Sequence, residues 1–243
     1  MRLHHVTVLF TAVIASASAA DPVKVFMLSG SDEYNSKEYL EKWGARLSAS
    51  GAYQCEVLHS AKTTTLPLAE KLATAQVFVT YTHRFQLDEA TLKPIKDWCQ
   101  AGKPIIALRT ASHGYQTWLE FDKLVLGGNY NKHGSQPVPV SIFEANKSHP
   151  LLAGVEVWQS RRLYTNLVDT LPAKANLLLT AVDKGKTSGL AWFNEYQLDG
   201  GTKGRAFYTS GGVEEDWAAP GFNRLLDNAI AWVRQPVSAA AKP

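Results

Sequence analysis

The chain has 243 residues, 45% of them hydrophobic and 19% charged, and its formal net charge is +3. This length fits one large α/β domain or two small ones, and the composition is that of a globular protein. The basic residues are not clustered, which argues against nucleic-acid binding. Two cysteines are too few for a disulfide scaffold or a cysteine-rich zinc site, and no internal repeat is present.

The first twenty residues have the pattern of a secretory signal peptide. Arg2 precedes an apolar run over 6–14 that is too short to span a bilayer, and two Ala-x-Ala cleavage sites precede Asp21. A buried N-terminal strand is the alternative interpretation. No lipoprotein cysteine follows the run, and no later segment has the length and hydropathy of a membrane span. We therefore expect an exported protein, periplasmic or secreted.

Export would place the two cysteines, Cys55 and Cys99, in an oxidising compartment where they can pair. Pairing needs Cα atoms within bridging distance, which the sequence does not give. A disulfide and two separate buried thiols both remain open.

In the first half of the chain, short apolar runs alternate with helical patterns. The expected strands cover 23–28, 54–58, 77–81 and 104–108. The expected helices cover 39–47, ended by Gly51, then 68–75, and 88–99, capped by Asp88 and ended by Gly102. This alternation predicts an α/β fold with three layers, flavodoxin-like, in which a mostly parallel sheet has helices on both faces.

The second half is richer in strands and shows no linker. Strands are expected over 138–143, 177–182, 189–196 and 205–209, and a terminal helix over 222–233. We therefore expect a single domain over 21–236, followed by a disordered tail over 237–243.

Ligands of open parallel sheets bind beyond the carboxyl ends of the strands, so residues that follow the strands are the candidates. The candidate catalytic residues are His113, His133, Arg109 and Glu33. The candidate substrate-binding residues are Asp32, Tyr115, Trp118, Tyr130, Tyr164, Glu214 and Trp217.

These residue types suit a sugar ligand and acid–base chemistry. His113 and His133 lie among glycines on polar loops, and histidine exchanges protons near neutral pH. Arg109 can hold an oxyanion or a carbonyl, aromatic rings can stack on the apolar face of a sugar, and the acidic residues Asp32, Glu33, Glu214 and Glu215 are available as partners of the histidines.

Of the seven tryptophans, four have core-facing patterns and two flank the expected cleft. The first set is Trp43, Trp98, Trp192 and Trp232, and the second is Trp118 and Trp217.

Several known mechanisms do not fit this sequence. The phosphate-binding P-loop and the Gly-x-Gly-x-x-Gly dinucleotide motif do not follow any expected strand. The stretch at Ser112 lacks the first glycine of a Gly-x-Ser-x-Gly elbow, and the His-Glu-x-x-His pattern of zinc proteases does not occur.

Six segments occur in an order found in one family. They are 24–30, 102–113, 126–134, 149–155, 191–192 and 204–212. With them the chain resembles the trehalose-utilisation (ThuA-like) family, which has a class I glutamine amidotransferase-like fold. The resemblance implies a role in carbohydrate utilisation, on a sugar or an oxidised keto-glycoside.

The chain departs from what that resemblance implies at three places. Where amidotransferases carry a cysteine nucleophile after the strand at 104–108, this chain has Arg109 and Thr110, so a thiolate glutaminase reaction is excluded. Gly212 stands where many family members carry a histidine, and Arg161-Arg162 precede Tyr164 where others carry an acidic pair.

Two hypotheses follow. The first is an exported enzyme that acts on a sugar or keto-glycoside as an isomerase, lyase or hydrolase, and the second is a carbohydrate-binding or accessory protein without catalysis. We expect no obligatory cofactor, although two histidines and a carboxylate can hold zinc with an open position. The expected partner is a small carbohydrate, a homo-oligomer is compatible with the sequence, and no nucleic acid or membrane span is expected.

Overall fold

The structure is a computed structural model that describes residues 21–61 and 65–237. The expected signal peptide over 1–20 lies outside the described residues. The same holds for 238–243, nearly all of the expected tail.

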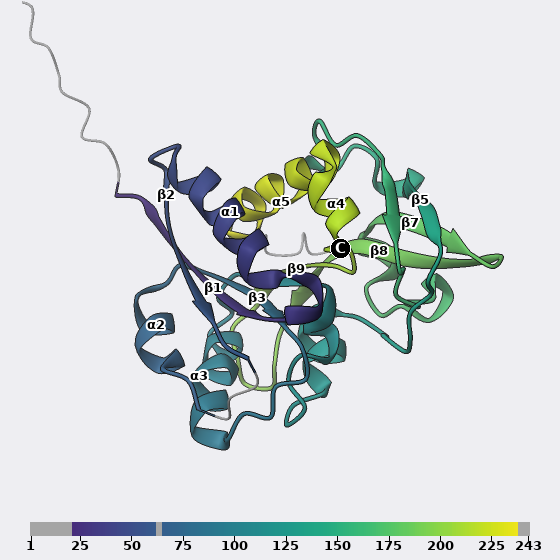
Figure 1. The fold of residues 1–243 in the computed structure, drawn as a ribbon. Coiled ribbons are helices and arrows are strands. Elements are labelled where there is room, and N and C mark those ends of the chain that lie inside the picture. Colours follow the sequence, from purple (N-terminus) through teal and green to yellow (C-terminus); the bar gives the residue numbers. More distant parts are fainter. Residues whose placement is uncertain (1–20, 62–64, 238–243) are drawn as a thin grey trace, which may run out of the picture.

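Within the described residues, nine strands form one sheet in the order β2-β1-β3-β4-β9-β8-β7-β5-β6 (Figure 1). The strands are β1 Val23–Gly30, β2 Tyr53–His59, β3 Val77–Thr82, β4 Ile105–Leu108, β5 Pro137–Ile142, β6 Gln159–Arg161, β7 Leu177–Asp183, β8 Lys186–Tyr196 and β9 Gly204–Thr209. The ladders from β2 to β9 are parallel, and those from β9 to β6 are antiparallel. The predicted α/β class is confirmed, with the parallel strands in the core.

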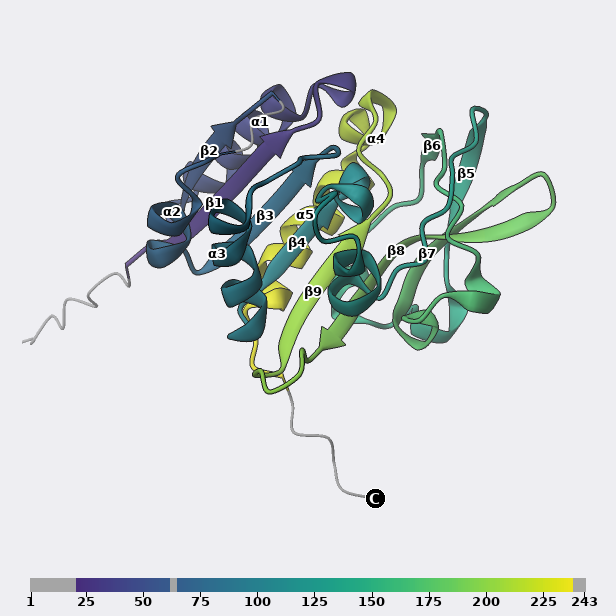
Figure 2. The ribbon, with the colours of Figure 1, turned by 90° about the horizontal axis from the view of Figure 1, so that it is seen from below.

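Helices cover both faces of the parallel strands, as predicted. They are α1 Ser36–Ser48, α2 Leu68–Thr74, α3 Glu89–Gln100, α4 Glu214–Ala218 and α5 Pro220–Val233. Helices α1 and α5 lie on one face, and α2 and α3 lie on the other (Figure 2). The predicted cap of α3 is confirmed, because the Asp88 carboxylate accepts a hydrogen bond from the Thr91 amide at 2.7 Å.

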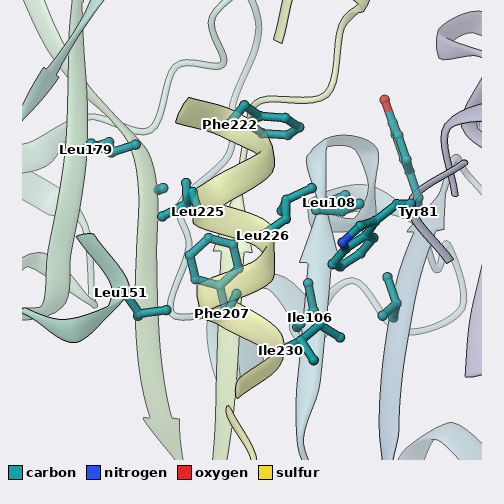
Figure 3. Close-up of a cluster of buried hydrophobic side chains, with 14 of the residues drawn as sticks. Tyr81, Ile106, Leu108, Leu151, Leu179, Phe207, Phe222, Leu225, Leu226 and Ile230 are labelled. Carbon is teal, nitrogen blue, oxygen red and sulfur yellow. The ribbon is translucent and has the colours of Figure 1, made fainter. Parts of the chain in front are cut away.

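Two buried clusters, one on each face, explain the uninterrupted apolar runs. Along β1, Val25 and Met27 belong to one cluster, and Phe26 and Leu28 belong to the other. Successive side chains of a strand point to opposite faces, so a strand covered on both sides must be apolar throughout. In the first cluster, Leu226 and Ile230 of α5 lie among side chains of the central strands (Figure 3).

The two cysteines are free and lie on opposite faces of the sheet. Cys55 packs at the margin of the first cluster, and Cys99 is fully buried in the second. The sheet between them excludes a disulfide. The four tryptophans expected in the core, Trp43, Trp98, Trp192 and Trp232, are all buried there.

Three elements carry no signal that sequence patterns detect. Strand β6 is a three-residue edge strand paired to β5. Helix α4 is one short turn, stabilised because the Asp216 carboxylate accepts the amides of Gly212 and Val213. The π-helix over 122–126 has no α-helical period.

Residues 21–61 and 65–237 contain no helix that is long and apolar enough to cross a bilayer.

The buried face of α5 should contribute strongly to stability. Leu226 is fully buried, so Leu226→Ala is expected to lower the free energy of unfolding by about 2–5 kcal/mol through lost burial and a residual cavity. Urea unfolding followed by circular dichroism measures the change. The control is Leu119→Ala, because Leu119 is 55% exposed, and its effect is expected to stay below about 0.5 kcal/mol. Equal losses in the two variants would contradict this description of the core.

Candidate functional site

The candidate site lies where the parallel strands end. From β1 the chain first adds β2 on one side and later β3 and β4 on the other, which creates a switch point between β1 and β3. The segment with His83 follows β3, and the turn with Arg109 and His113 follows β4. The predicted location is therefore the place where the topology brings these loops together.

Tyr164 is the centre of this site. Its ring centroid lies 4.6 Å from that of Tyr130, 5.8 Å from that of His113 and 6.3 Å from that of His133. The Arg109 guanidinium lies 4.6 Å from the same ring. Residues from three separate segments of the sequence thus meet around one buried tyrosine. We call these five residues the Tyr164 cluster.

His113 presents one ring nitrogen to the outside of this cluster. Its ring stacks on Tyr130 at 4.3 Å, and its Nδ1 lies 3.1 Å from the Ser112 hydroxyl, which itself donates to the Arg109 carbonyl. A neutral imidazole that donates from Nδ1 to Ser112 has its unprotonated nitrogen at Nε2. Nε2 has no partner in the described chain and is not buried, so it is open to a ligand.

The environment of His113 keeps the imidazole neutral. Burial is the main cause, followed by the positive charges of His83, Arg84, Arg109 and His133, and together they lower the pKa of His113 to about 3. Each of these effects disfavours the charged form of the imidazole.

Three of the four acidic residues expected as partners of the histidines pair with other side chains, which corrects the sequence interpretation for these three. Asp32 lies 3.3 Å from His59, Glu33 lies 3.0 Å from Arg162, and Glu215 lies 3.1 Å from Arg161. Arg161 and Arg162, noted in the sequence as a departure from an acidic pair, thus bind two of the carboxylates that were expected beside His113 and His133.

A hollow of about 450 Å³ lies beside the cluster and is lined by three of the acidic candidates, Glu33, Glu214 and Glu215. Tyr34, Arg161 and Arg162 also line it. The Arg109 guanidinium lies 4.2 Å from the ring of Tyr34, a residue that the sequence analysis missed. Tyr34 therefore contacts both this hollow and the Tyr164 cluster.

Arg109 supports the site from within the core. Its side chain is fully buried and donates to the carbonyls of Ser210 at 2.7 Å and Arg162 at 3.2 Å, while its Nε has no partner in the described chain. The sequence expectation that Arg109 grips a ligand oxygen is corrected, because no part of this side chain reaches the surface. Its charge acts on the site through the rings of Tyr34 and Tyr164.

Backbone strain is concentrated at this edge of the sheet. Arg84, Arg109 and Arg162 have φ values of 53°, 45° and 55°, and Asn35 beside Tyr34 has φ 49°. Left-handed conformations cost a non-glycine residue of the order of 1 kcal/mol and persist where the surrounding structure imposes them, often at functional sites.

Asp122 positions the loop that carries Tyr130 and His133, and sequence reasoning missed it. Its buried carboxylate accepts the Tyr130 amide at 3.0 Å, and burial raises its pKa to about 7. A Cβ at Gly128 would lie 2.2 Å from an Asp122 oxygen, so this close approach requires glycine. The available signal was an acid, Asp122, followed five and six residues later by the glycine pair Gly127-Gly128.

Three aromatic candidates lie away from the Tyr164 cluster. Tyr115 is buried in the core and its hydroxyl bonds to Thr80, so it cannot touch a surface ligand, which corrects the sequence expectation. Trp118 packs on Phe121 and lines a different hollow beside α3. Trp217 stacks on Tyr39 at 5.1 Å and donates its indole N–H to the Gly212 carbonyl.

Over the described ranges, no three His, Cys, Asp or Glu side chains come together in a set that could hold a metal ion. The candidate site therefore consists of the neutral imidazole of His113 with its open Nε2, the rings of Tyr130 and Tyr164 beside it, and positively charged side chains around it.

The family model for ThuA, described as trehalose utilisation, matches residues 24–233. The chain belongs to the ThuA family. No curated protein matches it in sequence.

Solved structures of ThuA-like proteins share the fold. A putative ThuA-like protein from Parabacteroides merdae is 19% identical, with 89% of this chain and 93% of that chain covered and a TM-score of 0.62. A putative ThuA-like protein from Bacteroides uniformis is 15% identical, with coverages of 91% and 95% and a TM-score of 0.64. At these identities the likeness shows the fold alone.

In this ThuA-family chain, the backbone conformation and the surroundings of Gly212 leave no room for a side chain. Its φ is 136°, and a Cβ there would lie 2.9 Å from the Tyr81 hydroxyl oxygen. Its carbonyl also accepts hydrogen bonds from that hydroxyl at 2.7 Å and from the Trp217 indole at 3.1 Å. The histidine that the resemblance leads one to look for could not be accommodated without rearranging this turn.

The low pKa of His113 has a measurable consequence. The imidazole is expected to stay neutral down to about pH 4 in the folded protein, because its pKa falls from 6.5 to about 3. Between these two values the unfolded chain binds the extra proton, so this residue lowers stability as the pH falls. Nitrogen-15 NMR of the imidazole follows the protonation directly.

The same effect can be followed by pH-dependent unfolding of the wild type and His113→Gln. The stability advantage of the wild type over the variant should shrink as the pH falls from 7 to 4. Titration of His113 near pH 6.5 in the folded protein would contradict the described environment.

Proposed function

We propose that this protein is an exported enzyme that acts on a sugar or an oxidised keto-glycoside, with His113 as the acid–base group. The observation that carries the proposal is the open Nε2 of a neutral His113, set against Tyr130 and Tyr164 in a cationic surrounding. The trehalose-utilisation family supports the carbohydrate class, and the Ala-x-Ala pattern before Asp21 supports export.

In this proposal, a keto-sugar lies with an acidic C–H bond against His113 Nε2. The C–H bond breaks, its proton passes to Nε2, and its electron pair moves into the neighbouring carbonyl to form an enolate. The positive charges of Arg84 and Arg109 stabilise the negative charge that develops on the enolate oxygen. Among the described residues, no carboxylate lies within 4.0 Å of either guanidinium, and Arg109 donates to carbonyls instead.

This arrangement also explains how an imidazole with so low a pKa can serve as a base. The positive charges around His113 disfavour its protonation. The negative charge of the enolate offsets them as it forms, because a nearby negative charge favours the protonated imidazole. His113 therefore becomes more basic as the reaction proceeds, and it can return the proton to a different carbon or to the leaving oxygen.

Replacing His113 tests the chemistry. His113→Ala is expected to lower kcat on a keto-glucoside by about 10²–10⁴-fold, because the proton acceptor is lost, with a smaller effect on KM. The assay follows consumption of a panel of 3-keto-glucosides by chromatography. Turnover unchanged in His113→Ala would refute the proposal.

His149→Gln is a suitable control, since His149 lies away from the Tyr164 cluster. It stacks on Phe193 at 4.6 Å and accepts the Leu151 amide. Melting temperatures of both variants separate lost chemistry from lost folding, and full activity is expected in His149→Gln.

The geometry of Gly212 favours a second candidate function, a carbohydrate-binding or accessory protein without turnover. The backbone at this position excludes the histidine that the resemblance implies, so one catalytic group would be missing. Binding would then use Tyr130, which is only partly buried and can offer ring surface to a sugar.

Calorimetry together with product analysis distinguishes the two functions. An accessory protein would bind the keto-glucoside saturably and release no product, and Tyr130→Ala would weaken binding by about tenfold through the loss of ring stacking. Product formed by the wild-type protein would exclude this second function.

A further inference from the structure

A separate hollow of about 230 Å³ is lined in part by His133. It is formed between the segment 132–134 and the tip of the β7–β8 hairpin. Its lining includes Lys132, His133, Asp183, Lys184 and Lys186.

The charge of this hollow is strongly positive. Among the described residues, no carboxylate lies within 4.0 Å of the amino groups of Lys132, Lys184 or Lys186, whereas Lys71, Lys93 and Lys147 elsewhere are paired. Three ammonium groups face a single acidic side chain, Asp183. Such an excess favours an anion at the hollow.

The backbone holds the lysines at this position. Lys184 and Gly185 have φ values of 49° and 74°, a pair of left-handed residues that tightly turns the hairpin between Asp183 and Lys186. A Cβ at Gly134 would lie 2.2 Å from an Asp183 oxygen, so the glycine lets the 132–134 segment approach the hairpin tip.

His133 connects this hollow to the candidate site. Its ring lines the hollow and lies 6.3 Å from Tyr164, which in turn lies 5.8 Å from His113. The His133 Nδ1 lies 2.8 Å from the Gly134 carbonyl, to which it donates, and this contact holds the imidazole between the two places. The rings of His133 and His113 thus both contact Tyr164, which links the hollow to the candidate site.

We propose that the hollow of Lys132, Lys184 and Lys186 is a subsite for the acidic group of a carbohydrate, a carboxylate or a sulfate ester, whose reacting ring lies at His113. This rests on the proposed function and narrows its substrate class to acidic oligosaccharides or their keto derivatives. Ammonium groups bind either oxyanion by charge.

Calorimetry with matched disaccharides tests the subsite. The probes are glucosyl-glucose, glucuronosyl-glucose and sulfated glucosyl-glucose, which differ only in the acidic group. The wild type is expected to bind at least one acidic disaccharide about tenfold or more tightly than the neutral one, with the preference falling as salt rises. The comparison of the two acidic probes identifies the oxyanion.

The variant Lys184→Asn/Lys186→Gln should lose most of this preference and keep the affinity for the neutral disaccharide. Asparagine tolerates the left-handed backbone at 184, and both lysines are exposed, so folding is expected to be retained. The control is Lys93→Gln/Lys96→Gln on α3, which removes the same charge elsewhere and should leave the preference intact.

The outcomes separate this subsite from the proposed chemistry. An acid preference that survives in Lys184→Asn/Lys186→Gln, or a wild type without any preference, overturns the subsite even if His113→Ala abolishes turnover. A preference lost only in the hairpin variant supports the subsite even if turnover proves independent of His113.

Discussion

The arrangement of the site depends on one buried charge, the guanidinium of Arg109. It follows directly after β4 in a left-handed conformation, donates to carbonyls of Ser210 and Arg162, and lies between the rings of Tyr34 and Tyr164. A buried cation is costly unless hydrogen bonds and polarisable faces replace water, and here two carbonyls and two aromatic rings do so. The ends of β4 and β9 and the loop before Tyr164 are thereby held together, and the turn that begins at Arg109 delivers His113 four residues later.

This buried charge also decides the electrostatics of the site. The carboxylates of Glu33 and Glu215 pair with Arg162 and Arg161, while burial and the positive charges of Arg84 and Arg109 lower the pKa of His113. The imidazole stays neutral, with its open nitrogen unprotonated, and the surrounding favours negative charge on whatever binds. The positive charge around His113 is consistent with an anionic intermediate and with an anionic substrate. Lys132, Lys184 and Lys186, which have no carboxylate within 4.0 Å among the described residues, add positive charge in the hollow that His133 lines.

Membership of the ThuA family accounts for the fold of this chain, but it does not identify the residues that act in this chain. The structural relatives are under 20% identical to this chain, so the likeness to them shows the fold alone. Gly212 illustrates the limit, since its φ of 136° and its contacts with Tyr81 and Trp217 leave no room for the histidine that the resemblance leads one to look for. The function has to be argued from the side chains that are present.

The sequence by itself determined the α/β class, the parallel half of the sheet and the edge at which polar loops gather, because apolar runs and helix caps are local signals that burial on both faces enforces. It also singled out His113, His133 and Tyr164. Only the tertiary structure decided their partners. Tyr115 has the same residue type as Tyr130, yet one is buried beside Thr80 and the other stacks on His113. Likewise, the pairing of Asp32 with His59 and of Glu33 with Arg162 depends on loops that are distant in the chain, and distances of that kind are set by packing rather than by spacing along the sequence.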